Sequence, residues 1–115
     1  AGVSTHQFYS IGVQRLGDVL AGFVMVYDST SGTIRMDLYK SRDGLTWTLA
    51  QANWIPIGAA GEWDDAMVVN GHGIIDIDGV WWLYYTGSPE GHSEPATDYR
   101  IGRVRVSASS LVNLG

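Results

Sequence analysis

The sequence contains no cysteine and very little lysine, and both shortages restrict what the protein can be. Without cysteine, a disulfide scaffold and metal sites built on thiolates are excluded, although the redox compartment stays open. The formal net charge is -5 and Lys40 is the only lysine. Because nucleic acids and anionic membranes attract basic patches, we expect neither of them as a partner.

Long apolar runs are missing as well. No run approaches the roughly 18 residues that a membrane span requires. The first residues do not resemble an export signal, and the sequence leaves a secreted and a cytoplasmic location equally open. The three histidines do not have the spacing of metal ligands, so we expect no metal site and no other cofactor.

Strand-like alternation is the main pattern that is present. With 115 residues, 45% of them hydrophobic and 17% charged, the chain is predicted to form a single domain, residues 1–115. Residues 33–39 alternate, with Ile34, Met36 and Leu38 on one face, which indicates a half-buried strand. No segment has a convincing helical period, so the predicted fold class is all-β.

Local patterns predict further strands and one tight turn. Residues 22–28 (GFVMVYD) and 80–87 (VWWLYYTG) are almost continuously apolar or aromatic, which suits central strands covered on both faces. The dipeptide Asp78-Gly79 is a strong signal for a two-residue hairpin. Residues 99–106 alternate with a slip at Gly102, which indicates a β-bulge.

The strand pattern is repeated within the chain. Placing Phe23–Tyr27 on Trp81–Tyr85 gives an offset of 58 residues. At this offset His6 falls on Asp64, so both units are expected to present a polar residue at the same place. The match is one of pattern and turn position, since few residues are identical.

Each repeat unit, about residues 5–57 and 62–115, is predicted to form four antiparallel strands. Such four-stranded sheets are the blades of β-propellers. Two blades leave open strand edges, so the propeller-like fold predicts either a homo-oligomer that completes a ring or a longer chain. The alternative is a compact β-sandwich closed by Greek-key connections.

The stretch from Glu62 to Gly87 resembles a blade of the five-bladed β-propeller glycosidase group, glycoside hydrolase families 32 and 43 and their relatives. In that group an aromatic-Asp pair precedes a glycine-containing turn, an apolar strand, an Asp-Gly hairpin and an aromatic strand ending in Tyr-Thr-Gly. The matching elements here are Trp63-Asp64, Asn70–Gly73, Asp78-Gly79 and Val80–Gly87. These motifs build blades, so the resemblance specifies the fold more than the chemistry.

A second resemblance lies in the segment Ser41–Trp47, which is similar to the Ser-x-Asp-Gly-x-x-Trp hairpin of the same group. The Asp43 carboxylate can accept hydrogen bonds from turn amides, and Gly44 can take a positive φ. Trp47 can pack the turn against the sheet. We therefore assign Asp43 a structural role and not a catalytic one.

The resemblance implies a carbohydrate-recognising module that binds a saccharide ligand. The Arg-Asp-Pro and Glu-Cys motifs of family 32 are missing, and family 43 spreads three carboxylates over more blades than two. A complete catalytic set is therefore not visible, and the enzyme question stays open. The alternatives are an arabinan-, xylan- or fructan-type glycoside hydrolase with a site completed by oligomerisation, and a structural or assembly protein without a ligand.

Four carboxylates are candidates for catalysis if the protein is an enzyme. Glycosidic hydrolysis needs two of them, one acting as acid and one as base or nucleophile. Asp64 and Asp65 begin the expected innermost strand, but neighbours on a strand point to opposite faces, so at most one faces the site. The other carboxylate would be Glu90 or Glu94, in the one loop inserted relative to the first unit.

The candidate ligand-binding residues are His72, Asp64, Trp63, Trp54 and His6. The resemblance places His72, between two glycines, where a side chain meets the sugar. A competing interpretation makes the preceding Asn-Gly a hairpin turn and His72 an ordinary strand residue. Trp54 and Trp63 flank the connection between the units, where their rings could stack on a sugar.

Overall fold

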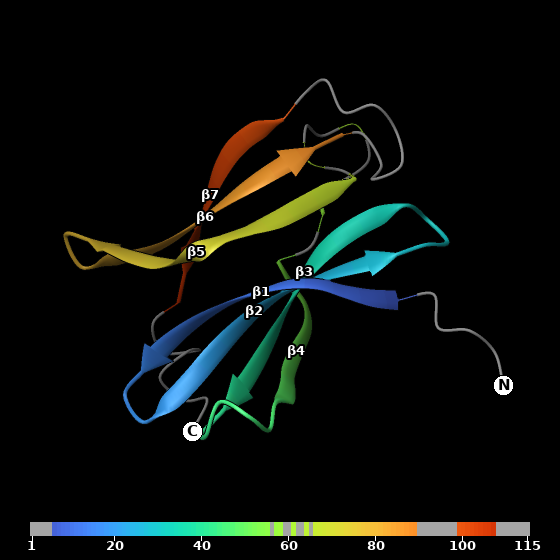
Figure 1. Ribbon diagram of the computed structural model, residues 1–115. Coiled ribbons are helices and arrows are strands. Elements are labelled where there is room, and N and C mark those ends of the chain that lie inside the picture. The colour runs from blue at the N-terminus through green and yellow to red at the C-terminus, as the bar shows by residue number, and fades with distance from the viewer. Residues whose placement is uncertain are drawn as a thin grey trace, which may run out of the picture.

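The computed structural model describes residues 6–55, 57–58, 61, 64, 66–89 and 99–107. As predicted the fold is all-β, and these residues contain no helix, hence none long and apolar enough to cross a membrane (Figure 1). The seven strands are β1 (His6–Leu16), β2 (Val19–Asp28), β3 (Thr33–Ser41), β4 (Thr48–Ile55), β5 (Met67–Ile77), β6 (Val80–Ser88) and β7 (Arg100–Val106). They form one sheet in the order β1-β2-β3-β5-β6-β7, with β4 paired to β3.

The sheet consists of two antiparallel groups, which separate clearly in Figure 1. We call β1–β4 the first meander and β5–β7 the second meander. A single parallel pair, Ile34 with Met67, joins them. Because β1, β3 and β5 therefore run in the same direction, all three begin at one end of the sheet, which we call the strand-start end.

The predicted Asp78-Gly79 hairpin is confirmed. Asp78 and Gly79 have φ values of 52° and 82°, the left-handed conformations that a tight β-hairpin turn requires. The Asp76 carboxylate accepts a hydrogen bond from the Gly79 amide at 2.8 Å. The equivalent turn of the first meander contains Gly17, with φ 67°.

The facing sides of the two meanders bury the hydrophobic core. The predicted alternation of β3 is confirmed, since Ile34, Met36 and Leu38 are all buried. The predicted central strand β2 is buried at almost every position. Each large apolar side chain buried here stabilises the fold by about 1.5–3 kcal/mol. The main core cluster contains Val19, Ala21, Phe23, Met36, Leu38, Val68, Leu83 and Val106.

The two meanders begin with strands of equal length, at an offset that differs from the predicted one. β1 and β5 each have 11 residues, and their first residues, His6 and Met67, are 61 positions apart. Their last residues, Leu16 and Ile77, are separated by the same 61 positions. The ends of these two strands are thus three residues further apart than the predicted offset of 58, which places His6 on Asp64.

The expected bulge at Gly102 is also wrong. The pairing of β6 with β7 continues without a shift through Tyr85–Gly102 and Tyr84–Arg103. The sequence pattern slips there because Ile101 lies on the face opposite Val104 and is 81% exposed. An apolar residue on the exposed face gives the appearance of a break in alternation.

The first meander has the four strands predicted for a blade, and the second has three within the described residues. Its expected fourth strand falls on residues 108–115, outside the described part of the chain. Among the described strands, neighbours in each meander are consecutive in sequence. The Greek-key connections of the sandwich alternative are not found among them.

Candidate functional site

Polar side chains from both meanders gather at the strand-start end of the sheet. His6 is the first residue of β1, and Asp28 is the last residue of the antiparallel neighbour β2. Asp64 lies three residues before β5 begins, and the segment that follows it is fixed by the Ala66 amide, which donates to the Ser88 carbonyl at 3.1 Å. The parallel direction of β1 and β5 thus brings acidic groups from both meanders to one end.

Asp64 is held by a half-buried phenol. The Tyr85 hydroxyl donates to Asp64 Oδ2 at 2.8 Å, and the Gly58 amide donates to the Asp64 carbonyl at 3.0 Å. Burial, then the hydrogen bond to Asp64 and its charge, raise the pKa of Tyr85 to about 12. Tyr85 therefore remains a neutral donor at physiological pH and fixes one oxygen of the carboxylate.

Asp64 does not begin the innermost strand, as the sequence predicted. Asp64 precedes β5 and lies in a turn, so the alternation of side chains along a strand does not decide where it points. Its neighbour Asp65 lies outside the described residues.

A bulge in β5 lies beside this carboxylate. Asn70 pairs with Tyr85 and Ile74 pairs with Leu83, so three residues of β5 stand opposite Tyr84 alone. The Asn-Gly dipeptide is thus part of a bulge inside a strand, and the prediction that it forms a hairpin turn is wrong. β-bulges are common next to binding sites because they redirect the chain. His72 is the central residue of the bulge, and its side chain is outside the described part.

A glutamine of the first meander fixes the end of the bulge. The Ile74 amide donates to Gln14 Oε1 at 2.6 Å, and Gln14 Nε2 donates to the Ile74 carbonyl at 3.4 Å. Gly73 has φ 146°, and a Cβ there would lie 2.8 Å from Gln14 Oε1. The backbone conformation therefore favours glycine at this position, and a Cβ would displace the Gln14 amide from its contact with Ile74.

The second polar group of the strand-start end is the pair of His6 and Asp28. His6 Nε2 lies 3.6 Å from Asp28 Oδ2. The Thr30 amide, which donates to Asp28 Oδ1 at 2.9 Å, is the main cause that lowers the pKa of Asp28, and the His6 charge adds to it. Asp28 is ionised at neutral pH, and its main role is to accept the hydrogen bond that closes the β2–β3 turn.

The predicted structural role of Asp43 is confirmed. Asp43 Oδ1 accepts hydrogen bonds from the Leu45 and Thr46 amides at 2.8 and 2.9 Å, and these bonds lower its pKa. Gly44 has φ 78°, and the Trp47 indole donates to the Gly44 carbonyl at 3.2 Å. The group closes a turn and is not part of the strand-start end.

The remaining candidates divide into those near the core and those outside the described residues. Trp54 stacks on Phe23, with ring centroids 5.5 Å apart, and packs against the main core cluster. This packing on the core differs from the sugar-stacking position predicted for the Trp54 ring. No group of three or more metal-ligating side chains occurs within the described residues. The candidates outside those residues are Trp63, Asp65, Glu90 and Glu94.

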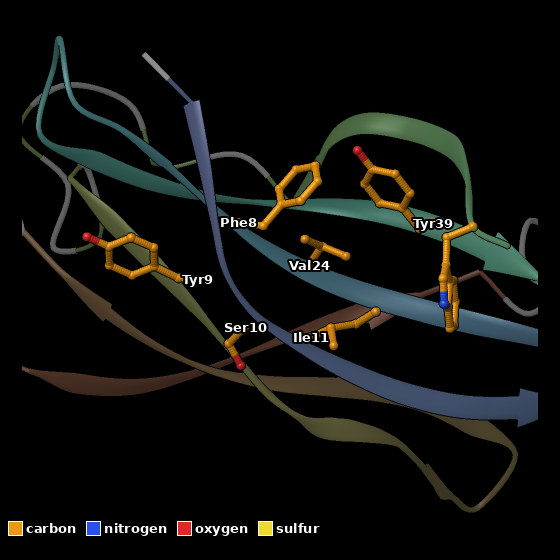
Figure 2. A pocket seen from close by; sticks show the side chains of 7 residues that line it. Phe8, Tyr9, Ser10, Ile11, Val24 and Tyr39 are labelled. Atoms are coloured by element: carbon orange, nitrogen blue, oxygen red, sulfur yellow. The ribbon is translucent and has the colours of Figure 1, made fainter. Parts of the chain in front are cut away.

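An apolar groove of about 440 Å³ lies on the face of the first meander that points away from the core. Phe8 and Tyr39 meet edge to face there, with ring centroids 5.7 Å apart. The other residues of its lining are Tyr9, Ser10, Ile11, Val24 and Trp47. Figure 2 shows Phe8 and Tyr39 on one side of β1 and Tyr9 on the opposite side. The groove is apolar and contains none of the carboxylates of the strand-start end.

Sequence reasoning missed Tyr85, Gln14 and Asp28. The Tyr-Tyr-Thr-Gly ending of β6 was interpreted as architecture, although one of its tyrosines contacts the candidate carboxylate. An aspartate directly before the Ser-Thr-Ser-Gly turn was a signal that could have indicated Asp28. Nothing in the local sequence indicates the contact of Gln14 with a residue 60 positions away.

No family profile matches the sequence, and no curated protein matches it. Among solved structures, the chain is similar to that of a BT0996 complex with RGII, with a TM-score of 0.68, 18% identity, and coverage of 89% of this chain and 33% of that one. It is also similar to one named "Glycoside hydrolase", with a TM-score of 0.64, 19% identity, and coverage of 91% and 34%. The chain thus spans about a third of the length of each, and the likeness is one of fold.

Proposed function

We propose that this protein is a carbohydrate-recognising module built from two β-propeller-like blades, with its sugar site at the strand-start end. The observation that carries the proposal is the Asp64–Tyr85 hydrogen bond beside the bulge of β5. It provides an oriented carboxylate on a scaffold that resembles part of a glycoside hydrolase structure.

The interpretation of the meanders as blades has two supports. Their first strands have equal lengths, and the turns that follow these strands lie at the same offset of 61 residues. The two solved structures that resemble the chain extend over about three times the matched length, and one of them is a glycoside hydrolase by name. The sequence resemblance to five-bladed glycosidases agrees with both supports.

The chemistry of the strand-start end suits a polyhydroxylated ligand. A carboxylate can accept about four hydrogen bonds, so Asp64 can receive sugar hydroxyls in addition to the Tyr85 phenol. Hydrogen bonds to a charged acceptor are stronger than those between neutral groups. We assign His72 and Trp63 to the same site, because they flank Asp64 and the bulge in sequence, and His6 to its first-meander side.

Binding can be measured on an array that carries arabinan, xylan, fructan and RGII fragments, followed by calorimetry on the strongest ligand. The Asp64→Asn variant keeps the size of the side chain and removes its charge. We expect its affinity to fall by at least about tenfold, because a hydrogen bond to a charged group contributes about 1.5–3 kcal/mol.

Asp18→Asn is the matched control, since this residue lies at the opposite end of the sheet with a side chain 93% exposed. It should bind like the wild type. Equal binding by the wild type and Asp64→Asn would contradict the proposed site. Failure of the wild-type protein to bind any of these polysaccharides would contradict the proposed function.

A glycoside hydrolase completed by oligomerisation is the second candidate, and the fold likeness to part of a glycoside hydrolase favours it. In that case Asp64 or Asp65 would act with Glu90 or Glu94 as the two carboxylates. Release of reducing ends from arabinan, xylan or fructan tests it. Activity that survives in both Glu90→Gln and Glu94→Gln would exclude these glutamates as the acid.

A further inference from the structure

Each meander has an outward face that carries exposed apolar side chains. On the first meander, Phe8 is 69% exposed and Ile11 and Val13 are each 46% exposed. On the second, Ile75 is 52% exposed and Ile101 is 81% exposed. Exposed apolar side chains on one face of a sheet indicate an interaction surface. We call these surfaces the first outward face and the second outward face.

Cross-strand pairing fixes which residues share the first outward face. Directly paired residues point to the same side of a sheet. Ile11 pairs with Val24, and Val13 pairs with Gly22. Gly22 also lies close to Trp47, because a Cβ there would be 2.9 Å from the indole ring. The first outward face is therefore continuous with the apolar groove of Figure 2.

The offset of 61 residues relates this outward face to a buried one. Ile74, Leu83 and Tyr85 of the second meander face the core between the meanders. Their counterparts 61 positions earlier are Val13, Gly22 and Val24, which all lie on the first outward face. The surface that the second meander buries inside the chain is thus the surface that the first meander leaves outside.

The reverse relationship also holds. Leu16, Val19 and Phe23 of the first meander pack in the core. Their counterparts 61 positions later are Ile77, Val80 and Tyr84. Pairing places these residues on the second outward face, because Ile77 pairs with Val80 and Tyr84 pairs with the exposed Arg103. In the core, the inner face of the first meander packs on the inner face of the second. The first outward face corresponds to the inner face of the second meander, and the second outward face corresponds to the inner face of the first.

We propose that a second copy of this chain docks its first outward face on the second outward face, head to tail, and so repeats the contact between the two meanders. Every copy of the chain carries both the first and the second outward face. A second copy can therefore supply the surface that either face requires. The chemistry also matches: Arg103 lies 4.1 Å over the Trp82 ring on one face, and the other face is rich in aromatic rings, on which guanidinium groups stack.

A contact between two different faces is heterologous, so it continues from copy to copy until a ring closes. This assembly does not depend on the sugar site, because Phe8 and Ile101 are not among the residues assigned to that site, although both lie near the strand-start end. Sugar binding and self-association can therefore fail independently.

The solution mass, measured by light scattering and sedimentation velocity over a range of concentrations, tests the proposal. The wild-type chain has a mass of 12.5 kDa and should associate into multiples of that mass. Phe8→Glu on the first outward face and Ile101→Glu on the second should each weaken association more than about 100-fold, because each buries a charge in an apolar contact. Leu45→Glu is the control, at a residue 87% exposed in the β3–β4 turn, and should associate like the wild type.

Mixing the two variants distinguishes a head-to-tail contact from a symmetric one. Phe8→Glu retains an intact second outward face, and Ile101→Glu retains an intact first outward face. A mixture should therefore form a dimer with one chain of each, although neither variant associates alone. A wild-type monomer at all concentrations would overturn the proposal, and so would association that only one of the two variants abolishes.

Discussion

Gln14 of β1 is hydrogen-bonded to both backbone groups of Ile74 in β5, and it thereby connects the first strands of the two meanders. The Ile74 amide donates at 2.6 Å and the Ile74 carbonyl accepts at 3.4 Å. This contact holds β5 at the residue where regular pairing with β6 resumes after the bulge. It links β1 with β5, which are not neighbours in the strand order.

Gln14→Leu should lower the free energy of unfolding by about 1–3 kcal/mol, because it leaves the partly buried Ile74 amide without its acceptor. Urea denaturation followed by tryptophan fluorescence measures the change. Gln51→Leu, at an exposed position of β4, is the control and should change stability by less than about 0.5 kcal/mol. Equal stability of Gln14→Leu and the wild type would show that the bulge does not depend on this contact.

Gly73→Ala should destabilise the protein by more than about 1 kcal/mol, because φ 146° is unfavourable for a residue with a Cβ and because that Cβ would lie 2.8 Å from Gln14 Oε1. A double-mutant cycle separates the two causes. In the Gln14→Ala background the steric conflict is gone and only the backbone cost remains, so Gly73→Ala should be less destabilising there. Equal costs in both backgrounds would contradict the steric contribution.

The strands were predictable because their signals are local. Asp78-Gly79 forms the expected turn, since an Asp-Gly dipeptide readily takes the two left-handed conformations required. Ile34, Met36 and Leu38 are buried as their alternation predicts. The offset of the two hairpins was misjudged because aromatic residues occupy both faces of β6. Trp81 packs on the core while Trp82 contacts Arg103 on the other face, so a run of aromatic residues does not by itself fix the offset.

The candidate site was predictable only in part, because its contacts connect distant segments. The carboxylate of Asp64 was identified as a candidate, but its donor Tyr85 lies 21 residues away across the β5–β6 hairpin. Which tyrosine of β6 reaches Asp64 depends on how many residues the bulge inserts into β5. Gln14 of the other meander holds Ile74 at the end of this bulge, and no local pattern contains that contact.

The pH dependence of stability should report the Tyr85 phenol. Because its pKa is raised from about 10 to about 12, the folded protein retains a proton that the unfolded chain loses near pH 10. The resulting stabilisation is complete below about pH 10 and decreases as the pH rises toward 12. Tyr85→Phe should remove this part of the decrease, as measured by urea denaturation between pH 8 and 12. Tyr99→Phe, at an exposed residue, should follow the wild-type curve.

Asp37 is a buried carboxylate on which the irregular pairing of β3 with β4 depends. Only 3% exposed, it accepts hydrogen bonds from Arg35 Nε at 3.0 Å and from the Asn53 amide at 2.6 Å. Asn53 has a φ of 56°, and the register between the two strands shifts close to this contact. The carboxylate thus supports a part of β4 where the regular ladder is interrupted.

Asp37→Ala should destabilise the protein by about 3 kcal/mol, because it leaves a guanidinium and a backbone amide without their shared acceptor. Asp37→Asn retains an acceptor for the Asn53 amide and should be less harmful, whereas the exposed Asp18→Asn should be neutral. Hydrogen exchange locates the effect: amides of β4 should exchange faster in Asp37→Ala, while those of β6 should change only with global stability. Uniform acceleration throughout the sheet would show that Asp37 acts on the whole fold and not on the β3–β4 pairing.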